Sequence, residues 1–298
     1  MKSLLFRILL LAVLLACTQH LRADAPVANQ PPADADTELH KVQGIFDSDL
    51  PKTQAAGTIK LIIHPHLGDF TSRSYLRLPL GFRAGFNDHL EVSATVESYF
   101  QHYLRRDHPG NGVGSVSFGG KYLIRDWLLP EYGVSAGINV RMPVGHPPVD
   151  LTDGYNHYAP FLTIATKPEG TPGLTYFFNP GLDIMRKSSV AGQFRKNDVQ
   201  SSSILLSAGL VYDRFPYHFT LEAGYQTTSL IGRDNKQFFF ARPGFALDLP
   251  GWAKFGSRAR WIVGLGTKIT IGPDGTRFDT GGKIRGEFSL KRMFGGGK

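Results

Sequence analysis

The sequence predicts an all-β fold, a transmembrane antiparallel up-and-down β-barrel of about twelve strands. Three observations support this class: an N-terminal export signal, a succession of long segments with two-residue periodicity, and connections of unequal length. The periodicity is clear in residues 85–100, GFNDHLEVSATVESYF, where apolar side chains alternate with polar ones after a turn-like start. Alternation alone also fits a β-sandwich, so the other two observations favour the barrel.

Residues 1–25 have the organisation of a signal peptide. A basic start precedes an apolar stretch at 8–16, and a small-x-small pattern ends at Ala25. The residues that end at Cys17 also resemble a bacterial lipobox, in which Cys17 would be lipidated. Cleavage after Ala25 and lipidation at Cys17 both stay open, and either one predicts export.

Composition excludes several classes of protein. The formal net charge is +8, but there is no run of five or six Lys/Arg and no nucleic-acid-binding motif, so nucleic acid is not an expected partner. The single cysteine lies in the leader, which leaves no disulfide framework or thiolate metal site, and no cofactor is expected. After the leader no stretch of 18 residues is apolar enough to predict a transmembrane helix.

The mature chain divides into two parts. Residues 26–56 are rich in Ala, Pro and Asp and predict a flexible N-terminal segment, whereas 57–298 predict the barrel. The alternating segments are ten residues or longer, as a tilted membrane-crossing strand of about 9–11 residues requires. They lie near residues 58–67, 73–84, 89–101, 113–124, 131–143, 155–167, 173–186, 200–213, 217–229, 237–249, 257–271 and 282–294.

The connections alternate in length. Those after the second, fourth, sixth and eighth segments are short, and several after odd-numbered segments are longer and more polar, such as RRDHPGNG and RKSSVAGQFRKND. Short turns at one end and longer loops at the other are typical of an outer-membrane barrel. The stretch LPGWAKFGS, after the tenth segment, departs from this pattern.

Within each segment, one set of alternate residues is apolar and the other carries charges of both signs. This pattern suits a wall between lipid and a polar lumen. Aromatic residues near segment ends, such as Phe215, Tyr217 and 238–240, predict girdles at the membrane interfaces, although aromatic residues also favour strands in general. The side chains predicted to line the lumen are Lys60, Arg77, Arg83, Glu91, Glu97, Lys121, Arg141, Glu222, Arg258, Arg260, Lys268, Lys283, Arg285 and Glu287.

Two interpretations of these lumen charges stay open. Closure of the barrel gathers most of the basic residues into one wall, which would raise the local concentration of anions. Alternatively, the charges pair with one another and fill the lumen.

Sites of chemistry are weakly indicated. His64 and His66 share a strand face, but a metal would need a third ligand, and a solvated pair is the alternative. Ser201 or Ser203 could meet His218 across strands, yet no G-x-S-x-G motif supports a hydrolase. We therefore predict a protein that is not an enzyme.

The segment GNGVGSVSFGGKYLIRDWLLPEYGVSAGINVRMPVG carries a resemblance to a known family. Its glycines, the Gly-x-Lys-Tyr motif that ends at Tyr122, and the Pro143-x-Gly145 motif resemble the outer-membrane transporters associated with the meta-pathway of phenol degradation. Ser115 stands where that family often has Asp. The resemblance implies a barrel and the passage of hydrophobic or aromatic solutes.

Together these features predict an outer-membrane channel or transporter-like pore for small solutes with a preference for anions. Expected partners are outer-membrane lipid, lipopolysaccharide and the barrel-assembly machinery, which would recognise Phe294 near the C-terminus. The alternatives are a structural barrel, a lipid- or lipopolysaccharide-modifying enzyme, and a soluble secreted β-sandwich.

Overall fold

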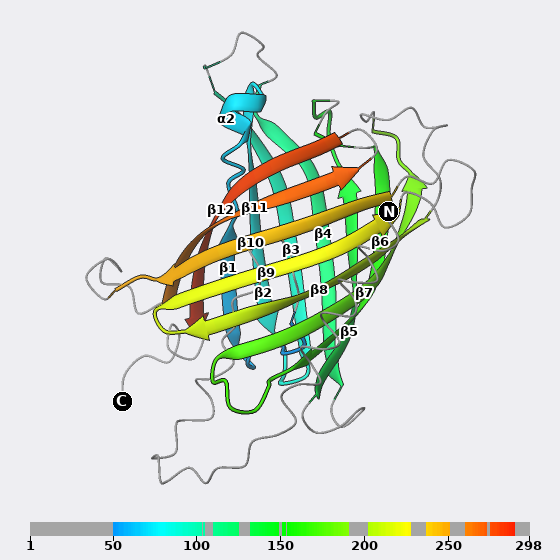
Figure 1. The fold of residues 1–298 in the computed structure, drawn as a ribbon. Coiled ribbons are helices and arrows are strands. Elements are labelled where there is room, and N and C mark those ends of the chain that lie inside the picture. The colour runs from blue at the N-terminus through cyan, green and yellow to red at the C-terminus, as the bar shows by residue number, and fades with distance from the viewer. Residues whose placement is uncertain are drawn as a thin grey trace, which may run out of the picture.

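The structure is a computed structural model in which a closed β-barrel forms almost the whole described chain (Figure 1). It describes residues 50–102, 104, 110–124, 132–148, 151–152, 154–190, 202–227, 237–250, 260–272 and 275–289. The predicted leader, Arg258 and Phe294 lie outside these residues.

Twelve strands form one closed sheet in which every strand pairs antiparallel with its neighbours in sequence, and β1 pairs with β12. The predicted fold class and strand number are confirmed. In chain order the elements are β1 (Thr58–Ile63), α2 (Asp69–Ser72), β2 (Tyr75–Gly85), β3 (Leu90–Gln101), β4 (Gly112–Ile124), β5 (Tyr132–Pro143), β6 (Tyr155–Thr166), β7 (Leu174–Lys187), β8 (Ser202–Arg214), β9 (Tyr217–Thr227), β10 (Gln237–Asp248), β11 (Arg260–Gly272) and β12 (Gly275–Ser289).

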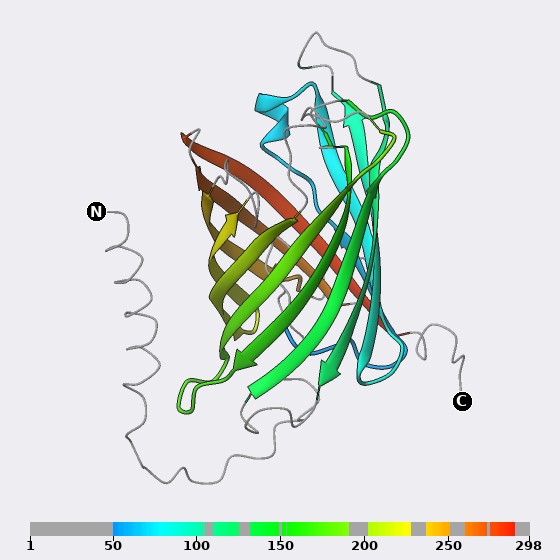
Figure 2. The same cartoon turned by 90° about the vertical axis from the view of Figure 1, so that its right-hand side faces the viewer.

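The two ends of the barrel differ, as Figures 1 and 2 show. We call the end with the connections 86–89 and 215–216 the short-turn end, and the end that carries α2 the long-loop end. The connection 249–259 is the long exception at the short-turn end, as the sequence indicated. The strands tilt across the barrel between these ends.

Two predicted strand boundaries are wrong. The first strand ends at Ile63 and not at 67, because Pro65 has no backbone N–H to continue the ladder and the chain then turns into α2. The last strand begins at Gly275 and not at 282, and a connection of only two residues separates it from β11. Gly275 has a φ of +101°, which a residue with a side chain rarely adopts, and this conformation permits the tight connection.

The strands alternate between an apolar outer face and a largely polar inner face. On β2, Leu80 and Phe82 are 41% and 43% exposed on the outside, whereas Tyr75 is buried inside. The outer face is thus covered by large apolar side chains that a soluble protein would bury. Further exposed members are Val92, Val96, Phe100, Phe118, Ile138, Leu182, Leu206, Phe219, Leu221, Phe245, Val263, Leu265 and Ile284.

Aromatic residues at strand ends divide between the two faces. Phe215 and Tyr217 are exposed at the short-turn end, as the girdle interpretation expected. Phe240, which the same interpretation placed at the interface, is instead buried inside the barrel, and so are Tyr99 and Phe177. Adjacent residues of a strand face opposite sides, so a run of aromatic residues cannot lie on one face.

The described part of the N-terminal segment enters the barrel at the short-turn end. Leu50 is only 3% exposed and belongs to an apolar cluster with Ala165, Phe177, Val211, Ala246 and Ile262, which come from five different strands. Ala56 forms a bridge with Gly85, and Gly57 N donates to Gly85 O at 3.0 Å. We call residues 50–56 the N-terminal strap. The predicted domain boundary at 56/57 stays a prediction.

Candidate functional site

A chain of ion pairs and hydrogen bonds follows the inner wall near the short-turn end. His218 on β9 lies between two carboxylates: its Nδ1 is 2.7 Å from Asp213 Oδ1 on β8, and its Nε2 is 2.8 Å from Asp248 Oδ2 on β10. Arg260 on β11 then contacts Asp248 with two nitrogens, each at 2.7 Å. These contacts connect four consecutive strands.

The surroundings of His218 determine its protonation. A carboxylate can only accept a hydrogen bond, so an imidazole that contacts one carboxylate at each ring nitrogen donates at both positions. His218 is 0% exposed, and this arrangement therefore makes it a buried imidazolium with two carboxylates as partners. The proton positions are assigned from these contacts.

The same chain of contacts crosses the place where the barrel closes. Glu287 on β12 forms an ion pair with Lys60 Nζ on β1 at 3.1 Å and lies 3.4 Å from Arg285 and 4.0 Å from Arg260. Lys60 and Arg285 side chains are only 1% and 2% exposed. A register that separated these charges would leave each one buried without a partner, at a cost of several kcal/mol, so the pairs favour the closed register over such alternatives.

On the other side of β1, a second acidic centre holds the N-terminal strap. Glu91 on β3 accepts from Arg83 Nη1 at 3.2 Å and from the backbone N–H of Gln54 at 2.9 Å. Lys121 on β4 donates to the carbonyl oxygens of Leu50 and Lys52 at 2.9 and 3.0 Å and lies 3.6 Å from Glu91. We call the charged groups of this end the short-turn belt: Asp213, His218, Asp248, Arg260, Glu287, Arg285, Lys60, Arg83, Glu91 and Lys121.

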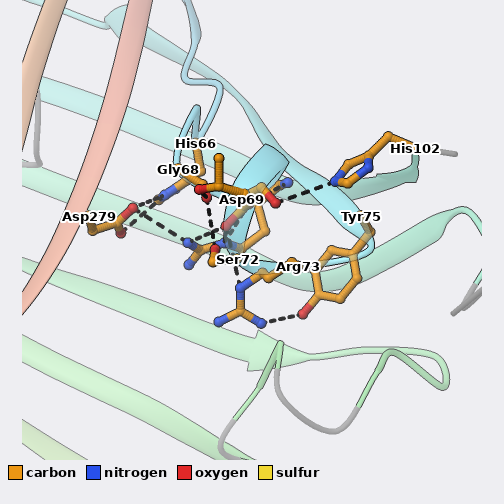
Figure 3. A network of polar contacts seen from close by, with 10 residues as sticks. His66, Gly68, Asp69, Ser72, Arg73, Tyr75, His102 and Asp279 are labelled. Atoms are coloured by element: carbon orange, nitrogen blue, oxygen red, sulfur yellow. Dashed lines mark hydrogen bonds and ion pairs between the residues drawn. The ribbon is translucent and has the colours of Figure 1, made fainter. Parts of the chain in front are cut away.

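A second network lies at the long-loop end and fixes α2 to the wall (Figure 3). Asp69 is 1% exposed and accepts from Arg77 Nε and Nη2, each at 2.9 Å, and from the backbone N–H of Arg77 at 2.8 Å. Asp279 on β12 binds His66 Nδ1 at 3.3 Å and lies 3.6 Å from Arg77. The Asp69 carboxylate therefore accepts a hydrogen bond from the backbone of β2 beyond the end of β1.

A third contact occurs on β5, β6 and β7. Arg141 Nη2 lies 3.0 Å from His157 Nε2, and His157 Nδ1 lies 2.8 Å from Asp183 Oδ2. Arg141 is exposed, in contrast to the buried basic residues of the short-turn belt.

The other residues predicted to line the lumen are distributed along the inner wall. Glu97 accepts from Ser115 Oγ at 2.8 Å, and Glu222 accepts from Arg242 Nη1 at 3.3 Å. Lys268 lies over the ring of Phe240, with 5.5 Å between Nζ and the ring centroid, and Lys283 is 8% exposed. That these residues line a pathway for solute stays a prediction.

Sequence reasoning missed several acidic members of these networks. Asp213 and Asp248 lie within the predicted segments 200–213 and 237–249, in phase with inward residues, so alternation alone could have identified them. Asp279 is in phase with the inward residues of β12 but precedes the predicted start at 282, so its identification required the correct start at Gly275. Asp69 lies in a four-residue helix outside any periodic segment, and no local signal marks it.

The predicted chemical sites take a different form in the structure. The rings of His64 and His66 are stacked, with centroids 5.1 Å apart, and among the described residues no three His, Cys, Asp or Glu side chains are grouped to hold a metal ion. Pairing of Ser203 with His218 is wrong: the β8–β9 register places His218 opposite Asp213, whereas Ser203 lies at the other end of β8. Within the described chain, no helix is both long and apolar enough to cross a membrane.

Comparison with known proteins gives matches in structure alone. The sequence matches no family model and no curated protein. An outer membrane channel from Pseudomonas putida F1 superposes with a TM-score of 0.53 at 11% identity, over 80% of this chain and 98% of that chain. The KdgM porin superposes with a TM-score of 0.44 at 11% identity, over 78% of this chain and 98% of that chain. The CymD monoaromatic hydrocarbon channel superposes with a TM-score of 0.37 at 11% identity, over 79% of this chain and 89% of that chain.

The fold is therefore that of porin-like outer-membrane barrels. At this level of identity the similarity shows a shared fold and nothing of the solute. The transporter family that the sequence resembles is compatible with this fold and stays a prediction.

Proposed function

We propose that this chain is an outer-membrane β-barrel that acts as a passive channel for small solutes, with a modest preference for anions. The observation that carries the proposal is the division of one closed sheet into an exposed apolar outer face and an inner wall lined by charged groups. Only a closed barrel lets strands cross a bilayer with every backbone group paired.

The location follows from the same division. Large apolar side chains cover the outer face of the barrel, and their exposure is favourable in lipid but not in water. The signal peptide predicted for residues 1–25 supplies export, and the partners are outer-membrane lipid, lipopolysaccharide and the barrel-assembly machinery. The long-loop end would then face outward and the short-turn end the periplasm.

The preference for anions is expected to be modest. In the short-turn belt the basic side chains outnumber the acidic ones, which raises the local concentration of anions. Most of these charges are nevertheless paired, and we expect this pairing to reduce the preference. The N-terminal strap occupies the short-turn end, and we therefore expect a small unitary conductance.

Planar-bilayer recording tests the channel. We expect small steps of ion conductance, and a reversal potential in a KCl gradient that indicates preference for chloride and shifts toward zero in Arg260→Gln. A folded protein that gives no conductance would contradict the channel and favour a structural or enzymatic barrel. Recovery of the protein in the soluble fraction without detergent would contradict the membrane location itself.

A further inference from the structure

Arg141 is exposed, as are Lys187 and Arg277 at the same end of the barrel, and in this it differs from the buried basic residues of the short-turn belt. It lies on β5 two residues before the strand ends at Pro143, in the half of the barrel near the long-loop end. Its register partners are Ser117 on β4 and His157 on β6. The side chain is exposed, whereas the side chains of Lys60, Lys121 and Arg285 are 1%, 4% and 2% exposed.

The contact with His157 fixes both the guanidinium and the tautomer of the imidazole. Arginine can only donate, so His157 Nε2, which lies 3.0 Å from Arg141 Nη2, accepts and carries no proton. The ring proton is then on Nδ1 and is donated to Asp183, whose oxygens lie 2.8 and 3.0 Å away. A neutral imidazole, itself oriented by a carboxylate, therefore holds Arg141.

We propose that Arg141 is the centre of a binding subsite for small carboxylate solutes, and that His157 is its positioning residue. The proposal rests on the channel function proposed above and names the class of solute. A guanidinium presents a planar fork of N–H donors that matches the two oxygens of a carboxylate, which a spherical anion cannot match. Ser117 and the exposed amide residue Asn139, two residues from Arg141 on the same face, are neutral polar neighbours that suit a carboxylate.

The geometry also gives the subsite a dependence on pH. A second proton on His157 would occupy Nε2, the atom that accepts from Arg141, so the contact breaks and two positive groups face each other. The charged and titratable groups around His157 are Arg141 from β5, Tyr155 on its own strand, and Asp183 and Lys187 from β7, which lie two residues to either side of its uncharged register partner Met185. Asp183 continues to bind the imidazolium, and the added charge favours anions.

The first experiment compares reversal potentials in gradients of potassium acetate and of KCl. In Arg141→Gln we expect the permeabilities of chloride and acetate relative to potassium both to fall, by about fivefold for the loss of one unit charge at about 4 Å in water. The permeability of acetate should fall further, because acetate also loses the two-point contact with the guanidinium. Arg186→Gln is the matched control, because Arg186 is an exposed arginine of β7 on the opposite face from Asp183. Equal changes in both variants would overturn the subsite.

Variants of His157 separate positioning from a general structural role. Glutamine can accept from Arg141 and donate to Asp183 but takes no proton, so His157→Gln should keep the acetate preference and lose its increase between about pH 8 and about pH 5. His157→Ala should lower the preference at every pH, because it removes the contact with Arg141 and supplies no charge in its place. A pH dependence in His157→Gln equal to that of the unchanged protein would overturn the positioning role.

A measurement without conductance distinguishes failure of the subsite from failure of the channel. Phenylglyoxal modifies accessible arginines, and peptide mass spectrometry of the detergent-solubilised protein reports each position. We expect acetate to protect Arg141 and not Arg186. Protection in a protein that does not conduct would keep the subsite and reject the channel. Conductance without protection would reject the subsite alone.

Discussion

The N-terminal strap should control how often the barrel opens, and Lys121 offers the sharpest perturbation. Its ammonium donates to two backbone carbonyl oxygens of the strap, those of Leu50 and Lys52, at 2.9 and 3.0 Å. Hydrogen bonds that involve a charged group contribute about 1.5–3 kcal/mol each to stability. With the lower value, Lys121→Met removes about 3 kcal/mol of strap binding, and the population with the strap withdrawn rises about a hundredfold.

Single-channel recording in planar bilayers measures this population as the fraction of time spent in a larger conductance level. The matched control is Lys268→Met, which removes an equal charge from the inner wall at a lysine that lies over Phe240. We expect frequent large openings in Lys121→Met and openings as rare as those of the unchanged protein in the control.

A substitution that changes no charge gives an independent test. A Cβ atom at Gly85 would lie 2.2 Å from the carbonyl oxygen of Ala55 and 2.3 Å from that of Gln54, so Gly85→Ala must displace the strap or the strand. It should increase large openings as Lys121→Met does. Rare openings in both substitutions, or an equal rise in Lys268→Met, would refute the assignment of the strap as the closing element.

Four other substitutions test the wall and its contact with α2. His218→Ala removes the buried cation, so that Asp213 loses this contact and Asp248 keeps Arg260 alone, and it should lower the free energy of unfolding by about 3–5 kcal/mol in urea titrations. Asp213→Asn, at a side chain 28% exposed, should cost less, and equal costs would contradict the buried pairing. Leu80→Arg places a charge on the outer face and should cost about 2–4 kcal/mol of folding into lipid vesicles, and an unchanged folding yield would argue against a lipid-facing side. Asp69→Asn weakens the contacts with Arg77, so proteolysis within 67–74 should become faster, and unchanged cleavage would show that α2 is held by other contacts.

The residues that face inward could be assigned from alternation, but their partners could not. The phase of β2 places Arg77 and Arg83 on the inner wall, yet one binds acidic groups from α2 and β12 and the other binds β3. Partner choice depends on the register between strands and on segments without periodicity, which no single strand encodes. For the same reason the sequence could not show that His218 meets two carboxylates in place of a serine.

The strap shows the same limit more strongly. Its composition, rich in Pro, Ala and polar residues, predicts a flexible segment, because it offers little apolar surface of its own to bury. Leu50 becomes buried only because the closed barrel presents apolar side chains from β6, β7, β8, β10 and β11 around it. That surface does not exist until the sheet has closed.

The sequence by itself determined the all-β class, the number of strands and the two faces of the wall. These follow from alternation and strand length, which are properties of the local backbone. Only the tertiary structure decided that β1 pairs with β12 and that Lys60 reaches Glu287, that the strap lies inside, and that His157 holds an exposed Arg141. Each of these contacts joins residues that closure and register bring together, and the energy of a contact between strands is not contained in either strand alone.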